Sequence, residues 1–158
     1  MKKILTAISG GVDSAVTAAL LQRAGYTAGG AVMRLHESAG QEVADAERSA
    51  RQLGIDFHVF DWRHEFSELV QSPFIRGYQA GETPNPCVIC NKTVKFGLFL
   101  QQALALGYDG MATGHYARVE YDAGSGRYLV KTALDASKDQ TYMLYHLSQA
   151  QLSRILLP

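Results

Sequence analysis

The chain has 158 residues, 47% of them hydrophobic and 19% charged, which predicts one soluble globular domain with its own core. Fifteen basic and fifteen acidic side chains cancel, and this balance excludes the strongly basic surface of a general nucleic-acid-binding protein. Two cysteines are too few for a disulfide framework, and no apolar run approaches the ~18 residues of a membrane helix, so we expect a cytoplasmic protein without a membrane partner.

The first predicted strand, residues 3–8, leads directly into a glycine turn and a helix. The turn reads Ser9-Gly10-Gly11-Val12-Asp13-Ser14. Its two glycines can adopt backbone angles closed to other residues and let main-chain N–H groups approach a ligand closely. The helix after the turn presents unpaired N–H groups and the positive end of its dipole. An ordinary strand-to-helix turn also favours Gly, Ser and Asp, but this combination predicts a cradle for phosphate or pyrophosphate.

Strand-like and helix-like segments alternate along the rest of the chain. The helix after the turn carries Val12, Val16, Ala19 and Leu20 on one face, which we expect to be buried. Further strands are predicted at residues 27–35, 55–60 and 110–113, and further helices at residues 41–53, 65–79, 93–106 and 148–157. Pro73 should kink or split the helix that contains it. The alternation predicts an α/β, Rossmann-like fold, a parallel twisted sheet with helices on both faces.

Residues 116–132 do not follow the alternation of single strands and helices seen in the rest of the chain. Two strand-like runs, residues 116–121 and 127–132, flank the turn sequence Asp122-Ala-Gly-Ser-Gly126. This pattern predicts an antiparallel hairpin that projects from the sheet.

A second segment with potentially reactive side chains lies at residues 82–96, Glu-Thr-Pro-Asn-Pro-Cys-Val-Ile-Cys-Asn-Lys-Thr-Val-Lys-Phe. Two prolines stiffen a loop that ends near a predicted helix start, so Cys90 is expected beside helix N–H groups and Lys92. Positive surroundings lower the pKa of a thiol and favour the nucleophilic thiolate. Alone, the pair Cys87 and Cys90 is also compatible with half of a zinc site, an iron–sulfur cluster, a redox pair or two structural thiols.

The glycine turn resembles the pyrophosphate loop of the N-type ATP pyrophosphatases, which cut ATP between the α and β phosphates and adenylate a carbonyl oxygen. With the segments Thr83–Phe96, Ala112–Ala117 and Lys138–Tyr142, the chain resembles the tRNA-specific 2-thiouridylases. That family converts the wobble uridine of tRNA to 2-thiouridine. The resemblance implies ATP and Mg²⁺ as cofactors, tRNA as a partner, and a protein persulfide as the sulfur donor.

The resemblance also implies roles for individual residues. ATP would be bound by Ala7, Ile8, Ser9, Gly10, Gly11, Val12, Asp13, Ser14, Met33 and Gly114. The tRNA would be contacted by Asn85, Pro86, Cys87, Lys138, Asp139 and Gln140. Cys90 matches the catalytic nucleophile, with Cys87 at best auxiliary. Asp13 either holds Mg²⁺ in catalysis or caps its helix, and His115 either bonds phosphate or substrate or is structural.

Full-length members of that family carry a second cysteine, which receives the persulfide, and further β domains that grip tRNA. This chain ends before both, so residues 1–158 are expected to form a single catalytic domain that binds ATP but does not thiolate tRNA unaided. Two alternatives remain. One is another AMP-forming synthetase or tRNA thiolase of the superfamily, which would not need Thr83–Lys92. The other is a nucleotide-binding module without turnover.

Overall fold

The computed structural model describes residues 2–158, which contain a five-stranded parallel sheet of order β3-β2-β1-β4-β7. The strands are β1 (Lys3–Ala7), β2 (Thr27–Arg34), β3 (Phe57–Asp61), β4 (Gly110–Ala112) and β7 (Ile155–Leu156). From β1 the chain moves outward to β2 and β3, then returns to the other side of β1 with β4. The carboxyl end of β1 is therefore a topological switch point, where α/β sheets bind ligands.

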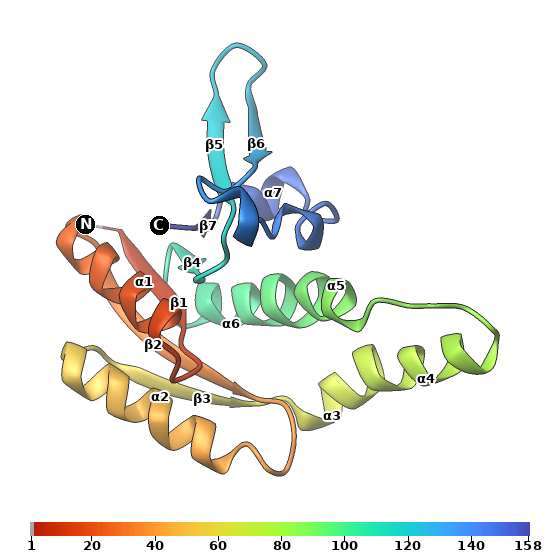
Figure 1. Cartoon of the computed structure of the whole chain (residues 1–158). Helices are drawn as coiled ribbons and strands as arrows, with labels where there is room; N and C mark the ends of the chain where they lie inside the picture. The colour runs from red at the N-terminus through yellow and green to blue at the C-terminus, as the bar shows by residue number, and fades with distance from the viewer. Residues whose placement is uncertain (1) are drawn as a thin grey trace.

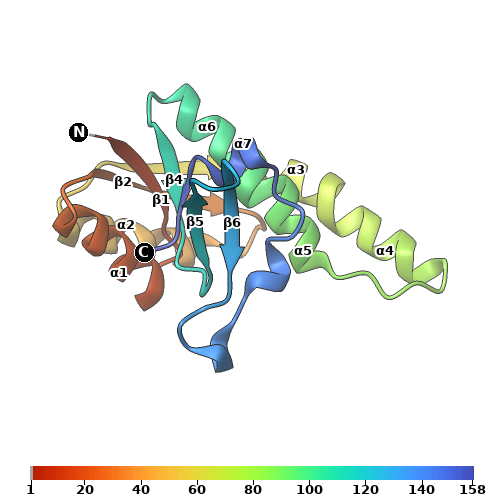
Figure 2. The same cartoon turned by 90° about the horizontal axis from the view of Figure 1, so that it is seen from above.

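Helices cover both faces of this sheet, as predicted (Figures 1 and 2). On one face, α1 (Val12–Arg23) and α2 (Gly40–Leu53) pack against Ile8 and Val32. On the other, the π-helical segment η2 (Asn91–Leu98) and α6 (Phe99–Ala105) bury two phenylalanines against Leu5 and Met111. Side chains alternate between the two faces of a strand, so that neighbouring residues of β2, Ala31 and Val32, belong to the cores on opposite faces of the sheet.

The buried face of α1 differs from the predicted one. Val12, Val16 and Leu20 are exposed, whereas Ala18 and Leu21 are buried against the sheet. The inner face of α1 carries the small side chains of Ser14, Thr17 and Ala18, which allow close approach to the strands. The apolar stripe was read correctly from the sequence, but the prediction that it faces the core is wrong.

The helical arm after β3 (Figure 1) contains Pro73 and continues through it. It consists of α3 (Arg63–Phe66), the π-helical segment η1 (Ser67–Gln71) and α4 (Ser72–Gln79). The expected break takes the form of the wider π-helical turns just before the proline. Pro73 itself lies in the first turn of α4, where its missing N–H is tolerated.

The next helix begins at residue 86 rather than at residue 93. Asn85 is the N-cap of α5 (Pro86–Cys90), and its side-chain oxygen accepts hydrogen bonds from the N–H groups of Cys87 (3.0 Å) and Val88 (3.3 Å). Asn at the N-cap and Pro at the first helical position are both typical starts. The helix then runs directly into η2, so both cysteines are helical.

The predicted hairpin is confirmed: β5 (Arg118–Asp122) and β6 (Arg127–Lys131) are antiparallel and project away from the main sheet (Figure 1). Two short 3₁₀ segments follow, η3 (Ala136–Lys138) and η4 (Thr141–Met143). Among the helices of residues 2–158, none combines the length and the hydropathy that a bilayer crossing needs.

The prediction of a helix over residues 148–157 is correct for its first turn and wrong after it. Ser148 caps α7 (Gln149–Leu152), but Ile155 and Leu156 then extend and pair with Met111 and Ala112. The edge of β4 offers unpaired backbone groups and a place to bury Ile155, and these outweigh one more helical turn.

Candidate functional site

The loop between β1 and α1 is closed by its own serines. The Ser14 hydroxyl donates to the carbonyl of Gly11 (2.9 Å) and accepts from the N–H of Ser9 (3.2 Å). Ser14 is buried and Ser9 is exposed. Ser14 therefore holds the shape of the loop, while the Ser9 hydroxyl remains accessible.

The position of Asp13 decides between its two predicted roles. Gly11 is the N-cap of α1 and Asp13 lies in the first helical turn, so the capping alternative is wrong. The carboxylate is exposed and accepts a hydrogen bond from the Tyr116 hydroxyl (3.3 Å). An exposed carboxylate at a helix N-terminus can still act as a ligand for a cation.

A cavity of about 350 Å³ opens beside the loop at the switch point of the sheet. Of the residues predicted to bind ATP, those that line it are Ala7, Ile8, Ser9, Asp13, Ser14, Met33 and Gly114. Gly10, Gly11 and Val12 do not line it. Its apolar wall, on the side of β2, is made by Val32, Met33 and Leu35, and its polar wall carries the loop after β1 and Thr113 after β4. Its size and its division into apolar and polar walls are typical of small-ligand sites.

His115 lies in the polar wall of this cavity. Its Nδ1 is 2.7 Å from the Thr113 hydroxyl, and its ring lies against Phe96 with centroids 5.5 Å apart. Burial, and secondarily the positive charge of Lys95, lowers the pKa of His115 to about 4. The imidazole is therefore neutral at neutral pH, and it meets a ligand as a hydrogen-bonding group rather than as a cation.

Cys90 lies behind the apolar wall of the cavity and does not line it. It is buried in a cluster with Val70 and Val94, against which Met33 also packs. Burial raises the pKa of the Cys90 thiol, and the nearby charge of Lys95 only partly opposes this effect. The predicted lowering of its pKa is wrong, because the helix begins at Pro86 and its free N–H groups lie a turn away.

Cys87 is the accessible thiol of the pair. It is exposed in the first turn of α5, whereas Cys90 is buried. Among residues 2–158, no group of three or more His, Cys, Asp or Glu side chains is placed to hold a metal ion. Within that part of the chain, the two cysteines have no further ligands for zinc or a cluster.

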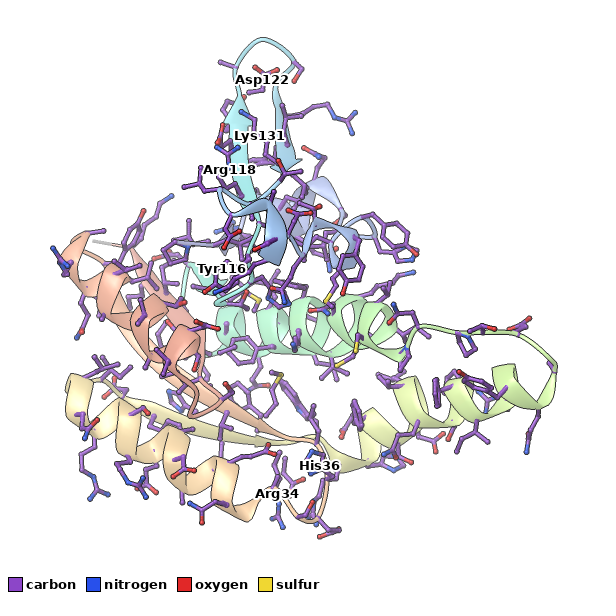
Figure 3. The ribbon with its side chains drawn as sticks, viewed as in Figure 1. Arg34, His36, Tyr116, Arg118, Asp122 and Lys131 are labelled. Atoms are coloured by element: carbon purple, nitrogen blue, oxygen red, sulfur yellow. The ribbon has the colours of Figure 1, made fainter. Side chains whose placement is uncertain are left out.

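The segment Lys138–Gln140 folds against the base of the hairpin, where Figure 3 shows Tyr116 below Arg118. Gln140 donates its N–H to the Tyr116 carbonyl (2.8 Å), and its side chain accepts the Tyr116 N–H (2.9 Å). The Lys138 ammonium lies 5.1 Å from the centre of the Tyr116 ring. Asp139 accepts hydrogen bonds from the N–H of Ala133 and from Thr141.

The residues predicted to contact tRNA are thus split by the fold. Gln140 lines the cavity beside the loop, and Lys138 is exposed. The side chain of Asn85 caps α5, and neither it, Pro86 nor Cys87 lines the cavity.

Two charged residues of the cavity had no role assigned from the sequence, Glu42 near the start of α2 and Lys95 in η2. The spacing of residues around Lys95 gave no signal. The direction of its side chain depends on the wider turns of a π-helix, which a repeat of 3.6 residues does not describe.

Comparisons with known proteins place this geometry in context. The family model described as the tRNA methyl transferase HUP domain matches residues 2–158. The tRNA-specific 2-thiouridylase MnmA of Chloroflexus aggregans is 48% identical over 100% of the chain and 47% of the relative. That of Caldicellulosiruptor saccharolyticus is 45% identical over 99% of the chain and 47% of the relative. The chain therefore spans about half the length of the curated relatives it matches.

Two solved structures share the fold. A predicted subunit of tRNA methyltransferase from Methanocaldococcus jannaschii has a TM-score of 0.57 and 18% identity, covering 100% of this chain and 68% of that one. The glutamine-dependent NAD+ synthetase of Acinetobacter baumannii has a TM-score of 0.54 and 18% identity, covering 70% of this chain and 21% of that one. At this identity the similarity concerns the α/β fold alone.

Proposed function

Because this chain belongs to the tRNA methyl transferase HUP domain family and resembles tRNA-specific 2-thiouridylases along its whole length, we propose that it is the ATP-binding catalytic part of a tRNA wobble-uridine 2-thiolase. The observation that carries the proposal is the cavity at the end of β1, where the glycine loop meets an apolar wall. A substrate tRNA also fits the cytoplasmic location expected from the sequence.

The two walls of the cavity suit the two ends of ATP. The apolar wall around Met33 offers a surface for adenine, and the loop with the first turn of α1 offers N–H groups to the phosphates. Gly10 and Gly11 do not line the cavity, so their proposed part is to shape the loop that meets the phosphates.

Asp13 is the residue that fits a Mg²⁺ ion. Mg²⁺ is commonly held by one or two carboxylates together with substrate phosphates, and Asp13 is an exposed carboxylate on the cavity wall. When bound, the ion would offset the negative charge of the phosphates.

The chemistry begins with a poor electrophile. The C2 carbonyl of uracil does not exchange oxygen for sulfur directly, so its O2 attacks the α-phosphorus of ATP and pyrophosphate leaves. The loop stabilises the charge that spreads over the phosphates, an electrostatic contribution. Sulfur from a persulfide then attacks C2, AMP departs with the original oxygen, and a thiolate forms a disulfide with the donor and frees the sulfur on C2.

Cys90 is the proposed thiol nucleophile, and its position sets a condition on that step. Its buried thiol has to become accessible and lose its proton before it can react. The target base would dock at Asn85–Cys87, on the first turn of the same helix, so this is the place where a rearrangement could expose Cys90.

The test measures pyrophosphate release from ATP in the presence of an anticodon stem-loop with a wobble uridine. We expect release with uridine and none with 2-thiouridine at the same position, because the latter has no O2 to adenylate. Asp13→Ala should abolish release, whereas Cys90→Ala should leave it unchanged, since adenylation precedes sulfur transfer.

Two outcomes would favour the other functions. Release that requires a small-molecule acceptor in place of the stem-loop would indicate another AMP-forming synthetase. ATP binding without release under any condition would indicate a nucleotide-binding module. No heat of binding with ATP and Mg²⁺ on folded protein would end the proposal altogether.

A further inference from the structure

Lys95 occupies an unusual position for a lysine. It is half-buried, and among residues 2–158 it is the only lysine or arginine that lines the cavity beside the glycine loop. His115, the other potential cation there, is neutral because its pKa is lowered to about 4. The positive charge available to a ligand in this cavity therefore comes from one side chain.

The ammonium group of Lys95 has no carboxylate partner in the fold. Asp13 and Glu42 line the same cavity, yet no ion pair within residues 2–158 involves Lys95. Removing an ammonium group from water without a counter-charge costs free energy. A lysine on a cavity wall without a carboxylate partner is free to bind an anionic ligand.

The backbone holds Lys95 in this orientation. Its neighbours in η2, Val94 and Phe96, are both 0% exposed and anchor the segment on either side. The side chain reaches the cavity from the wall formed by η2, whereas the loop reaches it from β1 and α1. Lys92, in the same helical segment, is exposed and does not line the cavity.

The surroundings of Lys95 indicate which phosphate it faces. Lys95 belongs to η2, the direct continuation of the cysteine-bearing helix α5, so it reaches the cavity from the side of that helix. Sulfur must reach C2 of uracil on that side, and C2 is one bond from the O2 that attacks the α-phosphorus. With the α-phosphate on that side, the β and γ phosphates of ATP would extend toward the loop.

We propose that Lys95 binds the α-phosphate of ATP opposite the glycine loop and stabilises the charge on that phosphate during adenylation. This role rests on the proposed ATP-dependent function. As O2 bonds to the α-phosphorus, the bond to the bridging oxygen breaks and its electron pair leaves with pyrophosphate. The N3 proton of uracil passes to solvent. The Lys95 ammonium offsets charge, first on the α-phosphate and then on departing AMP.

Calorimetric titration of the chain with ATP, AMP and adenosine tests the assignment. Lys95→Gln should weaken binding of ATP and AMP about 10- to 100-fold, the range for a lost hydrogen bond between charged groups. Its affinity for adenosine should be unchanged, which also reports that the cavity is folded. Lys95→Arg should keep most of the AMP affinity, and Lys92→Gln should bind all three ligands like the wild type.

The outcomes separate the two proposals. Suppose that the wild type binds ATP and that Lys95→Gln binds AMP as tightly as the wild type does. The role proposed for Lys95 is then wrong, and the proposed function stands. If Lys95→Gln loses adenosine affinity to the same extent, Lys95 is a structural residue and the assignment is again overturned. A wild-type chain that binds neither ATP nor adenosine would overturn both proposals.

Discussion

A β carbon added to Gly10 would lie 2.7 Å from the β carbon of Asp45. Asp45 belongs to α2, so this helix presses directly on the loop that follows β1. Gly10 also has φ +80°, a left-handed backbone conformation that residues other than glycine rarely adopt. The shape of the candidate phosphate loop therefore depends on contact with a helix 35 residues further along the chain (45 − 10).

Replacing Gly10 by Ala should lower the free energy of unfolding by about 1–3 kcal/mol, because both the backbone angle and the space are unfavourable. Gly11 is the matched control, since its φ is −82° and an added β carbon would meet no atom nearer than 3.5 Å. Urea unfolding of the two variants gives the comparison. Equal stability of Gly10→Ala and Gly11→Ala would contradict the described loop.

Cys87, predicted to be at best auxiliary, should be more reactive in the folded chain than Cys90, the predicted nucleophile. Exposed Cys87 should be alkylated by iodoacetamide much faster than buried Cys90 at neutral pH. Because burial raises the pKa of Cys90, its thiolate should form only at higher pH. The alkylation rate of Cys90 should therefore rise only there. Mass spectrometry of Cys87→Ser and Cys90→Ser chains assigns each rate, and a Cys90 that reacts first at pH 7 would refute this arrangement.

His115 should make the fold sensitive to acid. Its pKa is about 4 in the folded chain against an ordinary value of 6.5, so the unfolded chain binds more protons between these pH values. The free energy of unfolding should therefore fall as the pH drops from 6.5 to 4, by about 3 kcal/mol from this group.

The comparison needs His115→Gln, which should lose that part of the pH dependence, with the same substitution at exposed His36 as the control. Denaturant unfolding at pH 7 and pH 4.5 measures the difference. A wild type and a His115→Gln chain with parallel pH profiles would show that His115 titrates normally.

Two adjacent leucines test the rotation of α1. Leu21 is 2% exposed and Leu20 is 38% exposed. Leu21→Ala should cost about 2–5 kcal/mol because it leaves a cavity against the sheet, and Leu20→Ala should cost well under half as much. Thermal or urea unfolding ranks the pair, and the reverse ranking would restore the face predicted from the sequence.

Much of the fold was predictable because local patterns and tertiary packing agree. The helix over residues 41–53 ends where Gly54 takes the left-handed conformation, and the hairpin turns where the glycine-rich sequence predicts. Prediction failed where packing competed with a local pattern. Ile155 and Leu156 fit a helical repeat, but the open edge of β4 gives them hydrogen bonds and burial as a strand.

The same division applies to the site. The sequence alone determined that a glycine-rich loop between a strand and a helix follows the first strand, because glycines, serines and a helix start need only a few adjacent residues to act together. Only the tertiary structure decided that Ser14 braces the loop, that Cys90 is buried with a raised pKa, and that Lys95 reaches the cavity. These properties depend on solvent exclusion and on which helices pack together, and both are set by residues distant in the chain.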